Sequence, residues 1–472
     1  MGRRKRPIVE EVSIVDIGVK GKVIGKKEGE VYMLKDAVPG DVVTVQVKKS
    51  KKSYKEAELV SIEQFSPDRI EPECDHFKYC GGCNWQNFSY EKQIESKGSK
   101  VNQQIRRIGG FDGFETLPIL GAPEQYFYRN KLEFTFVDQR WLTPEQIQTE
   151  ETIERMPGLG FHVPGRFDWI LHVDKCHLQD EAHNAIRNFI YHKALELKLS
   201  FYAPRAQEGT MRNMVLRSTL KGEWMLLLMV KEVTDEVRTL ASSIVSEFPH
   251  IISLFLVHNN KVNDSYSDCP VELVHGENHL IESLERPNGA GEVKYIIGPK
   301  SFFQTNTKQA KNLYHIVYDW ANVKENELVY DLYTGTGSIA LFVADKAKHV
   351  VGVEYVPEAI ADAEKNAVLN GVENTSFFAG DMKGILTSEF IAKHGKPDVL
   401  ITDPPRAGMH EDVVNIILEA EPKRIVYVSC DPATQARDMA LLAVKYRLVK
   451  IQPVDMFPHT SHVENVALLE LK

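Results

Sequence analysis

The sequence of 472 residues lacks any long apolar run: the longest uninterrupted one is Trp224–Val230, far short of a membrane-spanning helix. The basic N-terminus Met1–Arg6 is not followed by the apolar core of a signal peptide, because residues 7–16 carry three acids. Low-complexity tracts and internal repeats are also missing. These absences exclude membrane and secreted classes and predict a cytoplasmic protein with no membrane partner.

Cysteine is scarce, and its spacing excludes a disulfide scaffold. Three of the six cysteines fall within ten residues, and the others lie far apart: Cys74, Cys80, Cys83, Cys176, Cys269 and Cys430. In a cytosolic enzyme, clustered cysteines indicate metal binding or catalysis.

The net charge of −9 argues against indiscriminate binding to nucleic acid. The charge is uneven, however. Residues 1–60 hold 14 Lys and Arg against 9 Asp and Glu, a balance of +5 that leaves −14 for the rest of the chain. A small basic module on an acidic body steers polyphosphate to one face. A solvated basic surface without a partner is the alternative.

The length predicts two or three domains, and residues 1–66 form the first. Short β-branched or alternating segments separated by glycine turns predict a five-stranded barrel resembling the oligonucleotide-binding (OB) fold; they cover Val12–Ile14, Lys22–Ile24, Val31–Leu34, Asp41–Val47 and Lys55–Ser61. The lysine-rich run at residues 48–52 falls at a hairpin tip, where it either contacts RNA or is simply solvated.

Two larger units follow. Residues 67–300 predict an α+β middle domain that contains a basic helix at 90–108, with Lys92, Lys97, Lys100, Arg106 and Arg107 on it. Residues 301–472 alternate strands with helices, which predicts a Rossmann-like α/β domain with a mainly parallel sheet.

A glycine turn follows the first strand of the α/β domain. Gly335-Thr336-Gly337 has no third glycine in the dinucleotide-binding pattern, so we expect a nucleoside ligand without a pyrophosphate. Glu354 ends the second strand, where a ribose is bound, and Asp381 follows the third, near an adenine amino group. With Asp403 after the fourth strand, these acids predict an S-adenosylmethionine site. Another nucleotide is the alternative.

Cys430 follows the predicted strand Arg424–Val428, at the sheet edge that also carries Asp403. This position favours a nucleophile over a small buried apolar residue. One reaction that needs such a thiol is methylation of uracil at carbon 5. That carbon becomes nucleophilic only after a thiolate adds to carbon 6, and a base must then remove the C5 proton. Glu464, His459 and His462 are all candidates for that base, and the chemistry alone does not choose among them.

Cys74, Cys80 and Cys83, together with the distant Cys176, form a four-thiolate set. Such a set suits a [4Fe–4S] cluster whose irons are all bound by protein. Structural zinc bound by four cysteines is the alternative.

Along nearly its whole length the chain resembles the RNA (uracil-5-)-methyltransferases, and within them the 23S ribosomal RNA branch. The resemblance rests on the cysteine set and on further motifs: Tyr128-Arg129-Asn130-Lys131, Phe302-Phe303-Gln304-Thr305-Asn306, Asp331-Leu332-Tyr333-Thr334-Gly335-Thr336-Gly337, Asp403-Pro404-Pro405-Arg406, Ser429-Cys430-Asp431-Pro432 and His462-Val463-Glu464. It implies a TRAM barrel, a middle domain with a [4Fe–4S] cluster and a class I methyltransferase domain.

The resemblance also implies roles for individual residues. Cys430 is the nucleophile and Glu464 the base; the donor contacts are Gln304, Tyr333, Glu354, Asp381 and Asp403; Phe302 stacks near the flipped base. From their charge, we expect contacts with the RNA backbone from Arg129, Lys131, Arg212 and Arg217, with structural salt bridges as the alternative. The expected partner is structured RNA, first 23S ribosomal RNA and second transfer RNA, with no obligate protein partner.

Overall fold

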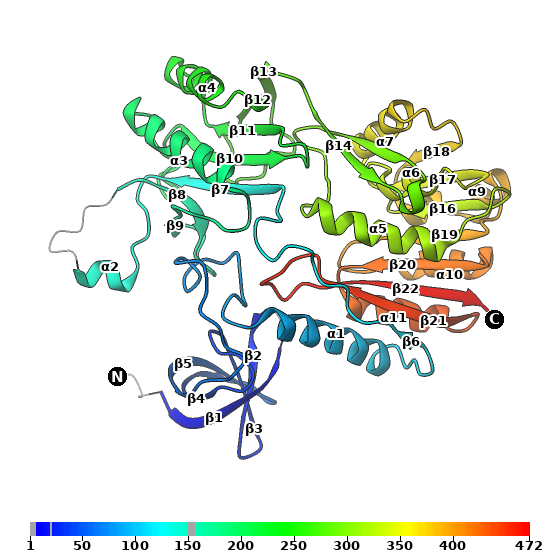
Figure 1. Cartoon of the computed structure of the whole chain (residues 1–472), viewed down its shortest axis with the longest axis horizontal. Coiled ribbons are helices and arrows are strands. Elements are labelled where there is room, and N and C mark those ends of the chain that lie inside the picture. The colour runs from blue at the N-terminus through cyan, green and yellow to red at the C-terminus, as the bar shows by residue number, and fades with distance from the viewer. Residues whose placement is uncertain (1–5, 19–20, 150–155) are drawn as a thin grey trace.

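The computed structural model of the chain describes residues 6–18, 21–149 and 156–472, so most of the basic N-terminal segment lies outside the described residues. The barrel, the middle unit and the C-terminal unit occupy the lower left, upper left and right of Figure 1. Among the described residues, none of the helices has both the length and the apolar character that crossing a bilayer requires.

The described N-terminal strands close into a barrel in the order β1-β2-β3-β5-β4, which confirms the predicted five-stranded barrel. They are β1 (Ile8–Ile17), β2 (Val23–Lys27), β3 (Glu30–Leu34), β4 (Val42–Ser50) and β5 (Lys55–Gln64). Alternate residues of β4, namely Val43, Val45 and Val47, fill the interior, as the two-residue period of a strand requires. The lysine-rich run spans the end of β4 and the turn to β5.

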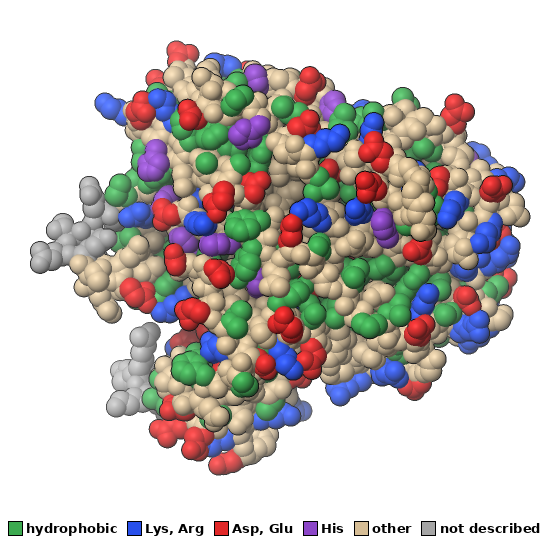
Figure 2. All heavy atoms as spheres, in the orientation of Figure 1, with side chains coloured by type: hydrophobic (Ala, Val, Ile, Leu, Met, Phe, Trp, Pro, Cys, Tyr) green, Lys and Arg blue, Asp and Glu red, His purple; other side chains and the backbone are tan. Residues whose placement is uncertain are grey.

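The surface charge of the barrel is mixed. Figure 2 shows acidic side chains gathered at the lower end of the barrel, with basic ones interspersed above them. The described residues of the barrel therefore present no continuous basic patch on this face.

The middle unit is α+β, as predicted, and its sheet has the order β13-β12-β11-β10-β7-β8-β9. Its elements are β7 (Lys131–Val137), α2 (Pro144–Thr149), β8 (Gly158–His162), β9 (Ile170–His172), α3 (Glu181–Glu196), β10 (Met211–Ser218), β11 (Trp224–Val230), α4 (Asp235–Glu247), β12 (Ile251–His258) and β13 (Val271–Gly276). Leu226 and Leu228 belong to the core beneath α3 and α4, whereas Met225 and Leu227 join the core shared with the C-terminal unit. The apolar run of β11 is thus buried on both faces.

The C-terminal sheet has the order β18-β17-β16-β19-β20-β22-β21-β6, parallel from β18 to β20 and antiparallel at β22. Its elements are α5 (Thr307–Ala321), β16 (Leu328–Leu332), α6 (Ser338–Val343), β17 (His349–Glu354), α7 (Pro357–Leu369), β18 (Thr375–Ala379), α8 (Met382–Ile385), α9 (Ser388–His394), β19 (Val399–Thr402), α10 (Glu411–Ala420), β20 (Arg424–Ser429), α11 (Pro432–Leu442), β21 (Tyr446–Val454) and β22 (Glu464–Leu471). The predicted Rossmann-like α/β unit is confirmed.

Segments before residue 300 also pack on the C-terminal unit. Helix α1 (Tyr90–Arg107) lies against α11, and the short strand β6 (Glu115–Thr116) pairs with β21 (Figure 1). The hairpin of β14 (Leu280–Glu285), η2 (Pro287–Gly289) and β15 (Glu292–Ile297) covers α7. The predicted domain boundaries at 66 and 300 stay predictions.

Candidate active site

A cavity of about 690 Å³ opens beside the carboxyl ends of β16, β17 and β19. Four of the five predicted donor contacts line it: Gln304, Tyr333, Glu354 and Asp403. Ligands of open α/β sheets bind at this edge, and a cavity of this volume accommodates a nucleoside-sized molecule.

Glu354 joins the glycine turn to the second strand of the parallel sheet. One carboxylate oxygen accepts the N–H of Gly335 at 3.1 Å, and the other accepts the N–H of Val356 at 3.0 Å. Gly335 and Gly337 have φ angles of +55° and +76°, so the turn depends on the conformational freedom of glycine. Because each carboxylate oxygen accepts more than one hydrogen bond, the fixed Glu354 keeps acceptor sites for ribose hydroxyls.

Asp381 differs from the other predicted donor contacts, because it does not line the cavity. It begins helix α8, where its carboxylate accepts the N–H of Lys383 at 3.3 Å. Asp381 nevertheless lies close to Tyr333. Burial raises the pKa of the Tyr333 phenol to about 12, and the charges of Asp438 and Asp381 add to this effect. Its contact with adenine stays a prediction.

Strand pairing places Cys430 beside Glu464. Ser429 of β20 pairs with Asn465 of β22 in antiparallel register, so the next residues along, Cys430 and Glu464, face each other. Burial, together with the charges of Glu464 and Asp403, raises the pKa of Cys430 to about 11. Burial also raises the pKa of Glu464 to about 8 and that of Asp403 to about 7. The thiol and the two carboxyl groups form one cluster, in which Glu464 is buried and Cys430 and Asp403 are partly exposed.

Arg406 supplies positive charge to this cluster. Its charge lowers the pKa of Glu464, and its charge and a hydrogen bond from its side chain lower that of Cys430. The Arg406 Nη2 atom lies 2.9 Å from Nδ1 of His462. Arg406 ends the motif Asp403-Pro404-Pro405-Arg406, but its role was not predicted; its position three residues after Asp403 was the available signal.

The structure separates the candidate bases. His462 contacts Arg406, and burial together with the Arg406 charge lowers the His462 pKa to about 4, so the ring is neutral at pH 7. The ring of His459 instead stacks on Tyr126, with centroids 4.4 Å apart, and its Nδ1 lies 3.2 Å from Nε2 of Gln93. Glu464 and His462 therefore lie at the cluster, and His459 does not.

The candidate RNA contacts fall into two groups. Phe302 lines the cavity and is 71% exposed. Arg129 and Lys131 are partly exposed, and burial, together with the charge of Arg217, lowers the Lys131 pKa to about 8. These three side chains remain accessible to a ligand.

Arg212 and Arg217 are buried, which contradicts their assignment to the RNA backbone. Arg212 donates to the carbonyl oxygens of Asn259 and Asn263 at 3.0 and 3.1 Å and pairs with Asp264. Arg217 donates to the carbonyl oxygen of Ser301 at 3.0 Å. Both guanidinium groups stabilise loops of the protein, because a buried cation needs internal acceptors.

The predicted cluster ligands Cys74, Cys80, Cys83 and Cys176 are neighbours, since their charges influence one another's pKa. Burial raises the thiol pKa of Cys80 and Cys83 to about 12. Across the described ranges, no group of three or more His, Cys, Asp or Glu residues is arranged to hold a metal ion. The iron–sulfur site therefore stays a prediction.

Comparison with known proteins gives concordant matches. The sequence model of the tRNA (Uracil-5-)-methyltransferase family matches residues 218–472. A Bacteroides thetaiotaomicron protein named "Uncharacterized RNA methyltransferase" is 50% identical over 460 residues, which cover 97% of this chain and 100% of the relative. A protein of the same name from Porphyromonas gingivalis is 48% identical over 468 residues, with coverage of 97% and 99%. The crystal structure of the Pyrococcus abyssi tRNA (uracil-54, C5)-methyltransferase in complex with S-adenosyl-L-homocysteine has a TM-score of 0.73 and 27% identity, and covers 98% of this chain and 100% of its own.

Proposed function

Because the chain belongs to the tRNA (uracil-5-)-methyltransferase family, we propose that it methylates carbon 5 of a uridine in structured RNA with S-adenosylmethionine as donor. The observation that carries the proposal is the register that brings Cys430 beside Glu464, next to the cavity lined by Asp403. A nucleophile, a base and a donor-sized cavity thus meet at one edge of the sheet.

Cys430 starts the reaction by adding its sulfur to carbon 6 of the uracil. The electrons of the C5=C6 bond move to the C4 carbonyl oxygen, and the resulting enolate makes carbon 5 nucleophilic. S-adenosylmethionine, when bound, would supply an electrophilic methyl group on its sulfonium to carbon 5 and would be left as the thioether S-adenosylhomocysteine. Arg406 assists the first step, because its charge and hydrogen bond favour the thiolate of Cys430.

Glu464 completes the reaction by removing the proton from carbon 5. The electron pair of that C–H bond re-forms the C5=C6 double bond, the C6–S bond breaks, and Cys430 leaves as a thiolate. The raised pKa of Glu464, about 8, suits a base that must take up a proton near neutral pH.

Four of the donor contacts follow from the cavity: Glu354 would bind the ribose hydroxyls, and Gln304, Tyr333 and Asp403 would enclose the rest of the donor. Asp381, which does not line the cavity, would meet the adenine from its place after the third strand of the parallel sheet. Phe302, exposed at the cavity, would stack on the extracted uracil or its neighbour.

We propose 23S ribosomal RNA as the substrate, on the resemblance of the barrel and cysteine set to that branch. The similarity to a transfer RNA enzyme of known structure favours transfer RNA as the second candidate. Mapping 5-methyluridine in both RNAs from a deletion strain and from that strain complemented with the gene distinguishes them. A site lost in one RNA and restored by the gene identifies the substrate.

For the four cysteines we propose a [4Fe–4S] cluster. The donor set fits, because it has four neighbouring thiols. Burial raises the pKa of Cys176, and the positive charges of Arg187 and Arg129 offset part of this increase. Structural zinc is the alternative, and a single zinc ion would need all four sulfurs within about 2.3 Å of it. Iron, sulfide and zinc analysis of the purified protein tests the assignment, and equimolar zinc without sulfide would contradict it.

Incubation of the protein with labelled S-adenosylmethionine and RNA tests the activity itself. We expect label in RNA as 5-methyluridine, and none with the variant Cys430→Ala. Absence of label with ribosomal and transfer RNA from the deletion strain would contradict the proposed function.

A further inference from the structure

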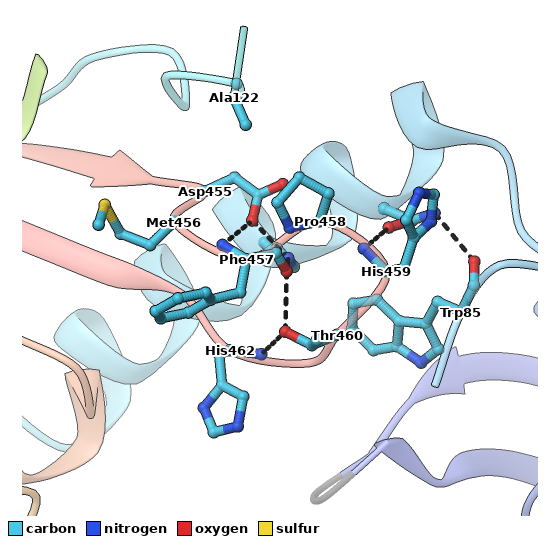
Figure 3. A network of polar contacts seen from close by, with 12 residues as sticks. Trp85, Ala122, Asp455, Met456, Phe457, Pro458, His459, Thr460 and His462 are labelled. Atoms are coloured by element: carbon cyan, nitrogen blue, oxygen red, sulfur yellow. Dashed lines mark hydrogen bonds and ion pairs between the residues drawn. The ribbon is translucent and has the colours of Figure 1, made fainter. Parts of the chain in front are cut away.

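The segment between β21 and β22, residues 455–463, is held in place by other parts of the chain (Figure 3). Four side chains from three separate segments donate to its backbone carbonyl oxygens: Gln309 to Asp455 at 3.1 Å, Asn306 to Met456 at 2.9 Å, Lys97 to Phe457 at 3.1 Å and Tyr128 to Pro458 at 3.0 Å. This segment, which we call the base loop, leads directly into Glu464.

Lys97 of α1 also forms an ion pair with the base loop. Its Nζ atom lies 2.6 Å from Oδ1 of Asp455, and both side chains are fully buried. The same carboxylate oxygen accepts the N–H of Phe457 at 3.2 Å. Two opposite charges removed from water have a large desolvation cost, so the pair is weak evidence for stability and consistent with a positioning role.

A second contact lies one helical turn earlier on α1. Gln93 accepts the N–H of His459 at 2.9 Å through its side-chain oxygen. The carbonyl oxygen of His459 accepts the N–H groups of Asn84 and Trp85 at 2.7 and 3.1 Å, and His459 has a left-handed φ of +62°. Gln93 and Lys97 are four residues apart on the buried face of α1, so the helix contacts the base loop at two points.

The side-chain hydrogen bonds of Gln93 and Lys97 go to the base loop and to residues 85 and 88, and not to Cys430 or the lining of the donor cavity. Cys430 follows β20, and the donor cavity is built on β16, β17 and β19. The base loop, in contrast, contains His462 and ends directly before Glu464. A displaced base loop therefore moves the base directly, whereas it reaches Cys430 and the donor cavity indirectly, through the contact of His462 with Arg406 and the bond from Asn306 to Met456.

We propose that Lys97 is a positioning residue that, through Asp455, aligns Glu464 for the release of methylated RNA from Cys430. The inference rests on the proposed function and assigns α1 a part in its last step. Glu464 takes the C5 proton, the C5=C6 bond re-forms and the C6–S bond breaks. Of the steps of the reaction, this one depends most directly on the position of the base loop.

The test compares wild type with Lys97→Met, Asp455→Asn and the double variant. Asp455→Asn keeps an oxygen acceptor for the Phe457 amide, and the double variant leaves no unpaired buried charge. Single-turnover reactions with labelled donor are quenched in denaturant, and intact mass spectrometry separates methylated RNA linked to Cys430 from free RNA. We expect unchanged methyl transfer and release slowed by about 10- to 100-fold, the scale of a small misalignment of catalytic groups.

The matched control removes another ion pair of low exposure, Arg424 with Glu327, at the opposite end of β20. We expect the control variant Arg424→Met/Glu327→Gln to lose stability without accumulating the linked RNA. Release at the wild-type rate by folded Asp455→Asn or by the folded double variant would overturn the inference. A wild-type protein that forms no methylated RNA would instead overturn the proposed function.

Discussion

The side-chain amide of Asn130 donates a hydrogen bond to the backbone carbonyl oxygen of Gln304 at 2.8 Å. The backbone N–H of Asn130 also donates to the carbonyl oxygen of Thr305 at 2.8 Å. These bonds join the motif that begins at Tyr128 to the motif that begins at Phe302. The middle unit therefore orders the segment that carries Gln304 into the cavity and holds Phe302 at its mouth.

The first prediction concerns Phe302. Stacking of a base on an aromatic side chain contributes about 1–3 kcal/mol, so we expect Phe302→Ala to lower kcat/KM for RNA by about 5- to 150-fold. Phe302→Tyr keeps the ring and should retain most of the activity. Phe167, in the middle unit, is also 71% exposed and serves as the control. An equal loss of kcat/KM in Phe167→Ala would show that the loss comes from a general change of the surface and not from base stacking on Phe302.

Replacing the base should separate the two halves of the reaction. Glu464→Gln keeps the size of the buried side chain but removes the proton acceptor. We expect methylated RNA to accumulate bound to the protein through Cys430, detected as a slowly migrating band on denaturing gels. The double variant Glu464→Gln/Cys430→Ala should show no such band. Normal turnover by Glu464→Gln would exclude this residue as the base.

The release step should depend on pH. Glu464 accepts a proton only when ionised, and its pKa is about 8. Release should therefore speed up as the pH rises from 6 through a midpoint near 8, and level off above about pH 9. The charge of Arg406 lowers the Glu464 pKa, so Arg406→Met should move the midpoint to higher pH. Arg447→Met, which removes an ion pair with Glu470, is the control and should leave the midpoint unchanged.

Donor binding should depend on Glu354. Hydrogen bonds to a charged group contribute about 1.5–3 kcal/mol, so Glu354→Gln should weaken S-adenosylhomocysteine binding by about 10- to 150-fold. Isothermal titration calorimetry measures this change without RNA. Glu373→Gln, at an exposed position outside the cavity lining, is the control. Unchanged affinity in Glu354→Gln would contradict the ribose contact.

The lysine-rich turn of the barrel should contribute to RNA affinity. Lys49, Lys51 and Lys52 are exposed, and replacing all three with Gln should weaken binding and reduce the slope of log affinity against log salt by about one per lost phosphate contact. A second triple variant at Lys393, Lys396 and Lys423, exposed on the C-terminal unit, is the control. Equal slopes in all three proteins would favour a simply solvated turn.

The architecture could be predicted from sequence because its signals are local. Strand and helix periods, glycine turns and β-branched runs act over a few residues, and they predicted the barrel, the α+β unit and the parallel sheet. The positions of Glu354 and Asp403 were predicted for the same reason: each follows from its place at the end of one strand.

Only the tertiary structure decided which charged groups are buried. From the sequence, Lys97 was one of several cations on a basic helix, and Arg212 and Arg217 were predicted to contact the RNA backbone. Long-range packing instead encloses all three. The pairing of β20 with β22 likewise sets Cys430 opposite Glu464, and no local pattern records which strands will be neighbours. Sequence alone therefore determined the elements and the chemical groups, whereas the folded structure determined which groups meet, because burial and proximity depend on residues far apart in the chain.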